Sequence, residues 1–314
     1  MSLREFINGK PMLEEPLLIE NLVPLLPHQV GLAVLGSPIN HSISPQLHKS
    51  ALAELASRHP SFSNWVYHKV EVNSKDLASA LIRLRECGYQ GLNLTIPHKV
   101  DVFSLLDTIN EEARNIGAVN TLMHDGKEWQ GFNSDGYGLE HALAGQLDVS
   151  LQSANILILG AGGAARAAAA RALSRGCKSI WIGNRSSIRL ENLVETLGRT
   201  FDVSGVTTFE ISKIPAVIFE HDKIVIINAT SLGLNPNDPS PLSLEGFPIS
   251  TRVYDMIYNP AETSLLKEAK ARGMAFENGL SMLVHQAIRS LEIWTKHEIS
   301  EEAMFAGARS AINF

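Results

Sequence analysis

Residues 156–165 are Ile156-Leu157-Ile158-Leu159-Gly160-Ala161-Gly162-Gly163-Ala164-Ala165, and this stretch decides the fold. Four apolar residues of strand length precede a glycine turn, and an alanine-rich run with high helix propensity follows. Gly160 permits a tight turn, Gly162 lets the backbone approach a pyrophosphate, and Ala165 occupies the third, packing position. The order of strand, turn and helix predicts a Rossmann-type dinucleotide-binding unit. The alternative is a glycine turn that only connects a strand to a helix.

The residues after the next predicted strand, Ile180–Ile182, bear on the identity of the dinucleotide. They are Asn184-Arg185-Ser186-Ser187-Ile188-Arg189. An acidic residue at this place would repel a 2′-phosphate, whereas Arg185 and Arg189 can pair with one. The segment therefore predicts NADP as the cofactor rather than NAD, with two solvated surface arginines as the alternative interpretation.

Apolar runs of strand length alternate with helical patterns on both sides of this unit. Predicted strands are Leu32–Leu35, Trp65–Val72, Gly91–Leu94, Ile156–Leu159, Ile180–Ile182, Ile224–Asn228 and Val253–Met256; helices are expected at Gln46–Ser57, around 77–84, and from Ser281 through Trp294. This alternation predicts an α/β fold with mostly parallel sheets covered by helices. The last helix has no strand after it, so we expect it to return to the first domain.

Two domains are expected from this order and from the length of 314 residues. Residues 1–134 and about 280–314 would form an α/β substrate-binding and catalytic domain. Residues 1–29 of it, which contain four prolines, would be an irregular or partly helical extension. Residues 135–279 would form the Rossmann NADP-binding domain.

Composition excludes several classes of protein. A hydrophobic fraction of 45% and a charged fraction of 19% indicate a soluble globular chain, and a net charge of -6 gives no basis for binding nucleic acid. The two cysteines, Cys87 and Cys177, are expected as free thiols, and no Cys/His spacing predicts a metal. Neither a signal segment nor a membrane span is evident, so we expect a cytoplasmic protein. The sequence leaves the oligomeric state open, a homodimer included.

Seven further segments carry a resemblance to a known family. They are Gly36–Pro45, Asn93–Lys99, Gly117–Thr121, Asn133–Gly136, Asn228–Gly233, Asp255–Pro260 and Met282–Ala287. In this order they resemble the shikimate dehydrogenases, from Leu32 to about Ala287. The resemblance implies an NADP-dependent oxidoreductase acting on a CH–OH group, which reversibly reduces 3-dehydroshikimate to shikimate in chorismate and aromatic amino acid biosynthesis.

The same resemblance implies catalytic and substrate-binding residues. Lys99 matches the family's catalytic lysine and Asp135 its aspartate partner; an ammonium group can polarise a ketone and deliver the proton that its reduction requires. Ser42 and Ser44 match the pair that binds the substrate carboxylate, with capping of the helix near Pro45 as a coexisting alternative. The other matched substrate-binding positions are Asn93, Thr95, Asn120, Tyr258 and Gln286. Of these, the two amides Asn120 and Gln286 could equally close loops.

Positions matched to the cofactor side extend from the glycine turn to the later loops. They are Gly160, Ala161, Gly162, Gly163, Ala164, Asn184, Arg185, Ser186, Arg189, Thr230, Ser231, Met256 and Gly279. The sequence departs from the family's pattern at Ser134 and Ser186, where threonine is usual, and at Ser281. Serine keeps the hydroxyl and loses a methyl, so no catalytic group is lost.

Rival interpretations stay open at this point. A quinate/shikimate dehydrogenase of the same superfamily, using NAD or NADP, would differ in how Ser42, Ser44 and Tyr258 crowd one carbon. Arg185 and Arg189 disfavour its strictly NAD-linked branch. A non-catalytic cofactor-binding sensor is disfavoured because Lys99 and Asp135 are both retained. A methylenetetrahydrofolate dehydrogenase would share the Rossmann half but should lack the Ser-x-Ser loop.

Overall fold

The computed structural model describes residues 6–7, 10–11, 15–235 and 237–312, which form two compact units. Among these residues, unit 1 comprises those within 6–114, 118–134 and 286–312, and unit 2 comprises 115–117 and those within 135–285. Residues 115–117 and 280–285 thus group with unit 2, whereas the sequence analysis placed both stretches with the first domain. Within the described residues, no helix is long and apolar enough to cross a membrane.

Unit 1 is built on a seven-stranded sheet with the order β3-β5-β4-β6-β8-β9-β7. The strands are β3 (Leu17–Leu18), β4 (Val30–Gly36), β5 (Trp65–Glu71), β6 (Tyr89–Leu94), β7 (Thr108–Ile109), β8 (Thr121–His124) and β9 (Trp129–Phe132). β8 pairs antiparallel with both β6 and β9, and the other pairs are parallel. A separate antiparallel pair joins β1 (Phe6–Ile7) to β2 (Lys10–Pro11).

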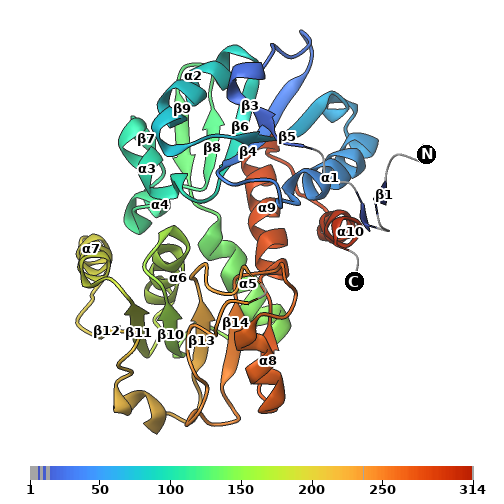
Figure 1. Cartoon of the computed structure of the whole chain (residues 1–314). Helices are drawn as coiled ribbons and strands as arrows, with labels where there is room; N and C mark the ends of the chain where they lie inside the picture. The colour runs from blue at the N-terminus through green and yellow to red at the C-terminus, as the bar shows by residue number, and fades with distance from the viewer. Residues whose placement is uncertain (1–5, 8–9, 12–14, 236, 313–314) are drawn as a thin grey trace. The chain divides into compact units, whose positions relative to one another are not determined.

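Helices cover this sheet. They are α1 (Ser44–Arg58), α2 (Leu77–Glu86), α3 (His98–Asp101), α4 (Glu111–Ile116), which ends in unit 2, α10 (Glu301–Ala311) and the later part of α9 (Leu280–Thr295). Short 3-10 turns lie at Ile19–Asn21, Pro60–Phe62, Ser74–Asp76 and Val102–Leu105. α1 and α10 lie side by side (Figure 1). The Trp294 indole of α9 donates to the Leu122 carbonyl of β8 at 2.8 Å, so α9 returns to the first sheet as expected.

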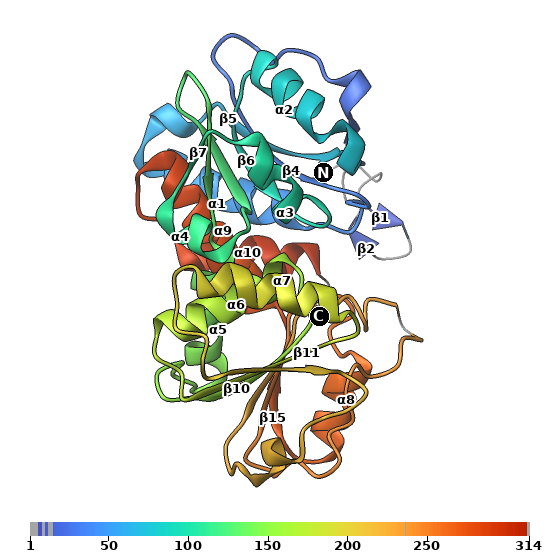
Figure 2. The same cartoon turned by 90° about the vertical axis from the view of Figure 1, so that its left-hand side faces the viewer.

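Unit 2 is an all-parallel, six-stranded sheet with the order β12-β11-β10-β13-β14-β15. Its strands are β10 (Asn155–Leu159), β11 (Ser179–Asn184), β12 (Val206–Glu210), β13 (Val225–Asn228), β14 (Arg252–Asp255) and β15 (Ala275–Glu277). Its helices are α5 (Asp135–Leu147), α6 (Gly163–Ser174), α7 (Ser187–Gly198) and α8 (Ser264–Ala271), with a 3-10 turn at Ala216–Glu220. α6 and α7 lie side by side next to β10 and β11 (Figure 2).

The strand order reverses between β10 and β13. The chain runs from β10 outward through β11 to β12, then returns to the other side of β10 and runs outward again. Dinucleotides bind at such a switch point, beyond the carboxyl ends of the parallel strands. The α/β class with mostly parallel sheets, predicted from the sequence, is confirmed.

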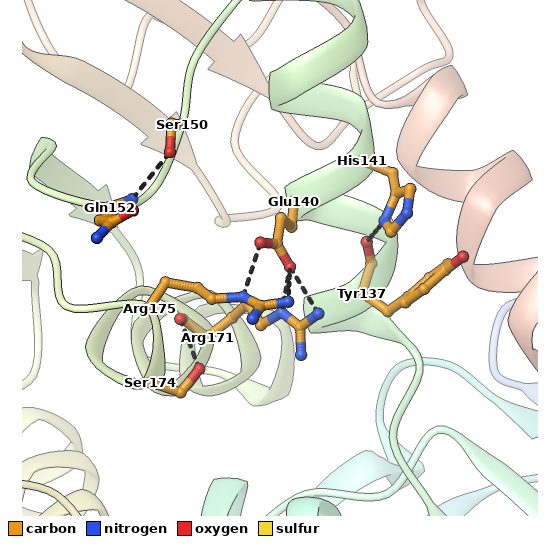
Figure 3. A network of polar contacts seen from close by, with 8 residues as sticks. All are labelled: Tyr137, Glu140, His141, Ser150, Gln152, Arg171, Ser174 and Arg175. Atoms are coloured by element: carbon orange, nitrogen blue, oxygen red, sulfur yellow. Dashed lines mark hydrogen bonds and ion pairs between the residues drawn. The ribbon is translucent and has the colours of Figure 1, made fainter.

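An ion-pair cluster ties α5 to α6 in unit 2 (Figure 3). Glu140 of α5 accepts from Arg171 at 2.6 and 2.7 Å and from Arg175 at 2.7 and 3.0 Å. The Glu140 and Arg171 side chains are 23% and 16% exposed, so water screens this cluster less than it screens a surface pair. Glu140 therefore ties α5 to the C-terminal end of α6, the helix that begins at the glycine turn.

Several elements were absent from the sequence analysis. The β8–β9 hairpin turns at Gly126, and helix α10 follows the helix expected to be last. The extension 1–29 is irregular over most of its described part, but Leu17–Leu18 adds an edge strand and Leu22 is buried in the core. Residues 1–5, 8–9 and 12–14 of that extension lie outside the described residues. Cys87 and Cys177 are both free.

Candidate active site

The loop between β4 and α1 carries the two serines expected to bind a carboxylate. The Ser42 hydroxyl donates to Ser44 Oγ at 3.2 Å and accepts from the Ser44 backbone N–H at 3.4 Å. α1 begins at Ser44, and its N-cap residue is Ile43, which makes no side-chain cap bond. Neither serine therefore acts as the conventional N-cap, and both hydroxyls lie at a helix N-terminus whose partial positive charge favours an anion.

A buried network of amides and hydroxyls lies where β6 ends and β8 begins. Asn93 Oδ1 accepts from the Tyr67 hydroxyl at 2.8 Å, and Asn93 Nδ2 donates to Ser290 Oγ at 2.9 Å. Ser290, fully buried on α9, also lies 2.8 Å from Thr121 Oγ1 and 3.1 Å from Ser134 Oγ. One hydroxyl thus joins three chain segments that carry or flank expected site residues.

Asn120 and Gln286 belong to the same network. Asn120 Oδ1 accepts from the Ser134 backbone N–H at 2.8 Å, and its Nδ2 donates to Ser134 Oγ at 2.9 Å. Gln286 Oε1 lies 3.4 Å from Ser134 Oγ and 3.5 Å from Asn120 Nδ2. These contacts hold both amides to Ser134, and substrate binding and a structural role stay open for each.

Thr95 and Lys99 follow β6 in a segment fixed at several backbone points. Thr95 N–H donates to the Leu35 carbonyl at 2.9 Å, and the Lys99 carbonyl accepts from Val119 N–H at 2.8 Å. His98 Nε2 lies 2.7 Å from the Val72 carbonyl, so this nitrogen carries the proton. Burial lowers the pKa of His98, which favours this neutral form. The half-buried Lys99 side chain therefore extends from a rigid single turn of helix.

The remaining residues expected at the substrate belong to unit 2. Asp135 is the first residue of α5 and is 3% exposed. Tyr258 follows β14 and is half-buried. Asp135 comes directly after Ser134 of the buried network, so the covalent chain connects the expected substrate residues of unit 2 to those of unit 1.

The glycine turn after β10 has the geometry that its sequence predicts. Gly160 has φ +113°, and a Cβ there would lie 2.9 Å from the Ala229 carbonyl oxygen. Gly162 is the N-cap of α6, and a Cβ on it would meet no heavy atom of the described chain within 4 Å. Gly162 thus leaves open space beside the N-terminus of α6, and the unpaired N–H groups and dipole of a helix N-terminus favour a phosphate.

The end of β11 carries exposed cationic groups and no acid. Arg185 and Arg189 are exposed and take part in none of the ion pairs among the residues the structure describes. Ser186 Oγ accepts from Arg189 N–H at 3.4 Å and caps α7, and Asn184 Nδ2 donates to the Ser186 carbonyl at 3.2 Å. Asn184 and Ser186 thus shape the turn from which the guanidinium groups extend.

A buried carboxylate organises the loops after β13 and β14. Asp255 accepts from Thr263 Oγ1 at 2.6 Å, from Asn228 Nδ2 at 3.0 Å and from the Ile257 N–H at 3.0 Å. Burial raises the pKa of Asp255, and these three donors oppose that rise. Asn228 Oδ1 in turn accepts from Thr230 N–H at 3.1 Å and from its hydroxyl at 2.7 Å. Thr230 and the exposed Ser231 are therefore presented on a fixed loop.

Met256 and Gly279 lie against each other on the same side of the sheet. A Cβ at Gly279 would lie 2.0 Å from the Met256 carbonyl oxygen, so only glycine allows this approach. The Gly279 N–H donates to the Ile257 carbonyl at 3.1 Å. The loops after β13, β14 and β15 thus meet at the carboxyl edge of the sheet, as does the glycine turn.

Comparison with known proteins identifies the family. Residues 34–122 match the model of the shikimate dehydrogenase substrate binding domain, 142–234 that of shikimate/quinate 5-dehydrogenase, and 279–304 that of the shikimate 5′-dehydrogenase C-terminal domain. A Geobacillus kaustophilus (strain HTA426) protein named shikimate dehydrogenase (NADP(+)) is 39% identical over 263 residues, which cover 83% of this chain and 91% of the relative. This chain belongs to the shikimate dehydrogenase family.

Two further members of the family extend the comparison. A Geobacter metallireducens protein named shikimate dehydrogenase (NADP(+)) is 40% identical over 272 residues, which are 85% of this chain and 91% of that protein. The crystal structure of shikimate 5-dehydrogenase from Thermus thermophilus in complex with NADP(H) and shikimate has a TM-score of 0.76 and 33% identity, covering 90% of this chain and 100% of that one. The resemblance inferred from the seven segments is confirmed.

Three polar residues of this shikimate dehydrogenase family member were missed as site residues. Thr121 and Ser290 complete the buried network in unit 1, and Asp255 holds the loops after β13 and β14 in unit 2. Thr121 and Asp255 stand inside matched segments and could have been weighed there. Ser290 lies four residues after Gln286 on one helix, so helical spacing alone placed it on the same face.

Proposed function

We propose that this chain is an NADP-dependent shikimate dehydrogenase that interconverts 3-dehydroshikimate and shikimate. The observation that carries the proposal is the buried network of Asn93, Asn120 and Ser290 beside the Lys99 segment. Hydroxyl and amide groups held this rigidly suit a polyhydroxylated ring, because every ring hydroxyl that becomes buried needs a partner.

The residues of unit 2 fit NADP. The open space at Gly162 and the N–H groups of α6 would hold the pyrophosphate, and Arg185 and Arg189 would pair with the 2′-phosphate. Thr230, Met256 and Gly279 would line the nicotinamide side. When bound, NADPH supplies the hydride for ketone reduction.

The residues of unit 1 would orient the substrate and provide the proton. Ser42 and Ser44 would hydrogen-bond the substrate carboxylate, while Asn93 and Thr95 position ring hydroxyls. Lys99 would polarise the ketone oxygen and donate a proton to it as the carbon gains hydride, so that C–H and O–H bonds both form. Asp135 would orient the Lys99 ammonium group and accept a hydrogen bond from a neighbouring ring hydroxyl.

We also propose a cytoplasmic location and leave a homodimer as a possible assembly to be tested. A cytoplasmic location is supported by the free thiols of Cys87 and Cys177, since reducing compartments keep cysteines unpaired. Cell fractionation tests the location, and light scattering distinguishes a monomer from a homodimer.

Absorbance at the reduced-nicotinamide band tests the activity. Purified protein is mixed with shikimate or quinate, each with NADP or NAD. Reduction that is fastest with shikimate and NADP supports the proposal. A preference for quinate or NAD would place the chain in the quinate branch of its family, and binding of shikimate without turnover would identify a sensor.

Substitution of Lys99 tests its role. We expect Lys99→Ala to lose roughly 10² to 10⁴ in kcat, as for a positioned acid, while NADP binding persists. Lys99→Arg is the matched variant, because it keeps a positive charge but does not release a proton at neutral pH. Normal turnover by Lys99→Ala would remove this residue from the mechanism.

A further inference from the structure

A lysine is buried inside unit 1, beneath the loop of the two serines. Lys69 lies on β5, between the neighbouring strands β3 and β4, and is 3% exposed. An ammonium group is costly to bury unless its interactions compensate for lost hydration. Its Nζ donates to the Asn40 carbonyl at 2.8 Å. A buried cation on the strand next to the edge of the sheet therefore contacts the backbone of the β4–α1 loop directly.

The contacted loop is anchored to β5 at two points. The Ser37 hydroxyl, at its start, lies 3.3 Å from Glu71 Oε1 and 3.2 Å from Asn73 Oδ1. Lys69 holds its middle at Asn40, two residues before Ser42. Within the loop, the Ser42 N–H donates to the Ile39 carbonyl at 3.0 Å. The position of Ser42 and Ser44 thus depends on the Lys69 anchor.

The positive charge of Lys69 can act on a bound carboxylate, which a neutral hydrogen-bond donor at the same place would not do. Serine hydroxyls can hydrogen-bond a carboxylate but do not balance its charge. The N-terminus of α1 adds a partial positive charge, and the first turn of α1 contains no acid. The Lys69 ammonium group adds positive charge at Asn40, two residues before Ser42, whereas the Glu71 carboxylate lies at Ser37, five residues before it.

We propose that Lys69 is a positioning and specificity-determining residue for the substrate carboxylate. It holds the Asn40 turn and places positive charge two residues before Ser42, which favours a carboxylate over an uncharged group of the same shape. The inference rests on the proposed function, since it assumes that these serines receive the carboxylate of shikimate.

The test compares shikimate with shikimate methyl ester, which keeps the ring and hydroxyls but lacks the charge. The quantity measured is the ratio of kcat/KM for the acid to that for the ester, with NADP saturating. We expect Lys69→Met to lower this ratio roughly 10-fold, by raising KM for shikimate, which corresponds to about 1.4 kcal/mol of interaction between the two charges. The KM for NADP should stay within about twofold, because the cofactor residues lie in unit 2.

Two further variants separate charge from anchoring. Lys69→Gln keeps a donor for the Asn40 carbonyl without the charge and should lower the ratio as Lys69→Met does. Lys75→Met removes an exposed lysine six residues away and should leave the ratio unchanged. The ratio does not depend on the fraction of folded enzyme, so partial misfolding of a variant cannot imitate the effect.

The outcomes are distinct. Equal losses for acid and ester in both Lys69 variants would make Lys69 a purely structural anchor and overturn the inference. If Lys75→Met lowered the ratio as much as Lys69→Met does, the effect would come from the net charge of the protein, and the inference would also be overturned. Failure of the unsubstituted protein to oxidise shikimate would instead refute the proposed function.

Discussion

His48 should make unit 1 lose stability as the pH falls below neutral. The side chain lies on α1, is fully buried, and stacks on the Tyr67 ring with centroids 4.0 Å apart and planes 6° apart. Neither ring nitrogen has a hydrogen-bond partner among the described residues. Burial lowers the pKa of His48 from 6.5 to about 3.

The size of the effect follows from proton linkage. Between pH 3 and 6.5 the unfolded chain binds a proton at His48 that the folded chain does not bind, so stability rises with pH in this window. Each pH unit well inside the window corresponds to about 1.4 kcal/mol. Lowering the pH from 7 to 5 should therefore remove about 2 kcal/mol of folding free energy through His48 alone.

Urea unfolding at pH 7 and pH 5 measures this loss. Tryptophan fluorescence is the suitable signal, because Trp65, Trp129 and Trp294 all belong to unit 1. His48→Phe keeps an aromatic ring against Tyr67 and removes the titrating group. Between pH 7 and pH 5, the free energy of unfolding of this variant should therefore decrease by about 2 kcal/mol less than that of the unsubstituted protein.

The control for this experiment is His28→Phe, which removes an exposed histidine and should leave the pH dependence unchanged. Other buried histidines titrate equally in all three proteins, so the comparison isolates His48. If the unsubstituted protein and His48→Phe lost the same free energy between pH 7 and 5, the buried neutral state of His48 would be refuted.

Three further predictions follow from the described contacts. Arg185→Ala combined with Arg189→Ala should raise KM for NADP roughly 100-fold and leave KM for NAD nearly unchanged, as initial rates would show; a parallel rise for both would exclude pairing with a 2′-phosphate. Glu140→Gln should cost about 1 to 3 kcal/mol in urea unfolding, because two guanidinium groups lose their counter-charge, whereas the exposed Glu195→Gln should cost under about 0.5 kcal/mol. Ser290→Ala should raise KM for shikimate and lower the free energy of unfolding by about 1 to 3 kcal/mol; an unchanged KM would leave Ser290 a structural role only.

Much of the fold was predictable because its strands are continuous apolar runs. β4, β6, β10 and β13 are buried over nearly their whole length, so periodicity and the flanking turns locate them within about two residues. β3 was missed because it has only two residues, and these are exposed. The β8–β9 hairpin was missed because its strands are short and carry polar residues.

The parts of the site were predictable to different degrees. The glycine turn at 160–163 is a motif of consecutive residues that act through their own backbone, so the sequence alone indicates it. Lys99 and Asn120 carry no such local signal and were found through the resemblance to the family. Ser290 was missed because its role arises from contacts with residues as far as 197 positions away in the chain, at Asn93.

The antiparallel strand β8 explains why the polar network in unit 1 can exist. β8 begins beside the end of β6, with Thr121 paired to Asn93, and the hairpin returns so that Phe132 of β9 pairs with Thr121. Ser134, just after β9, therefore reaches the same edge of the sheet as Asn93. If β8 ran parallel to β6, Asn120 and Thr121 would lie at the start of their strand, beside the start of β6 and far from Asn93 at its end. The single reversed strand in an otherwise parallel sheet is thus what brings these amides and hydroxyls together.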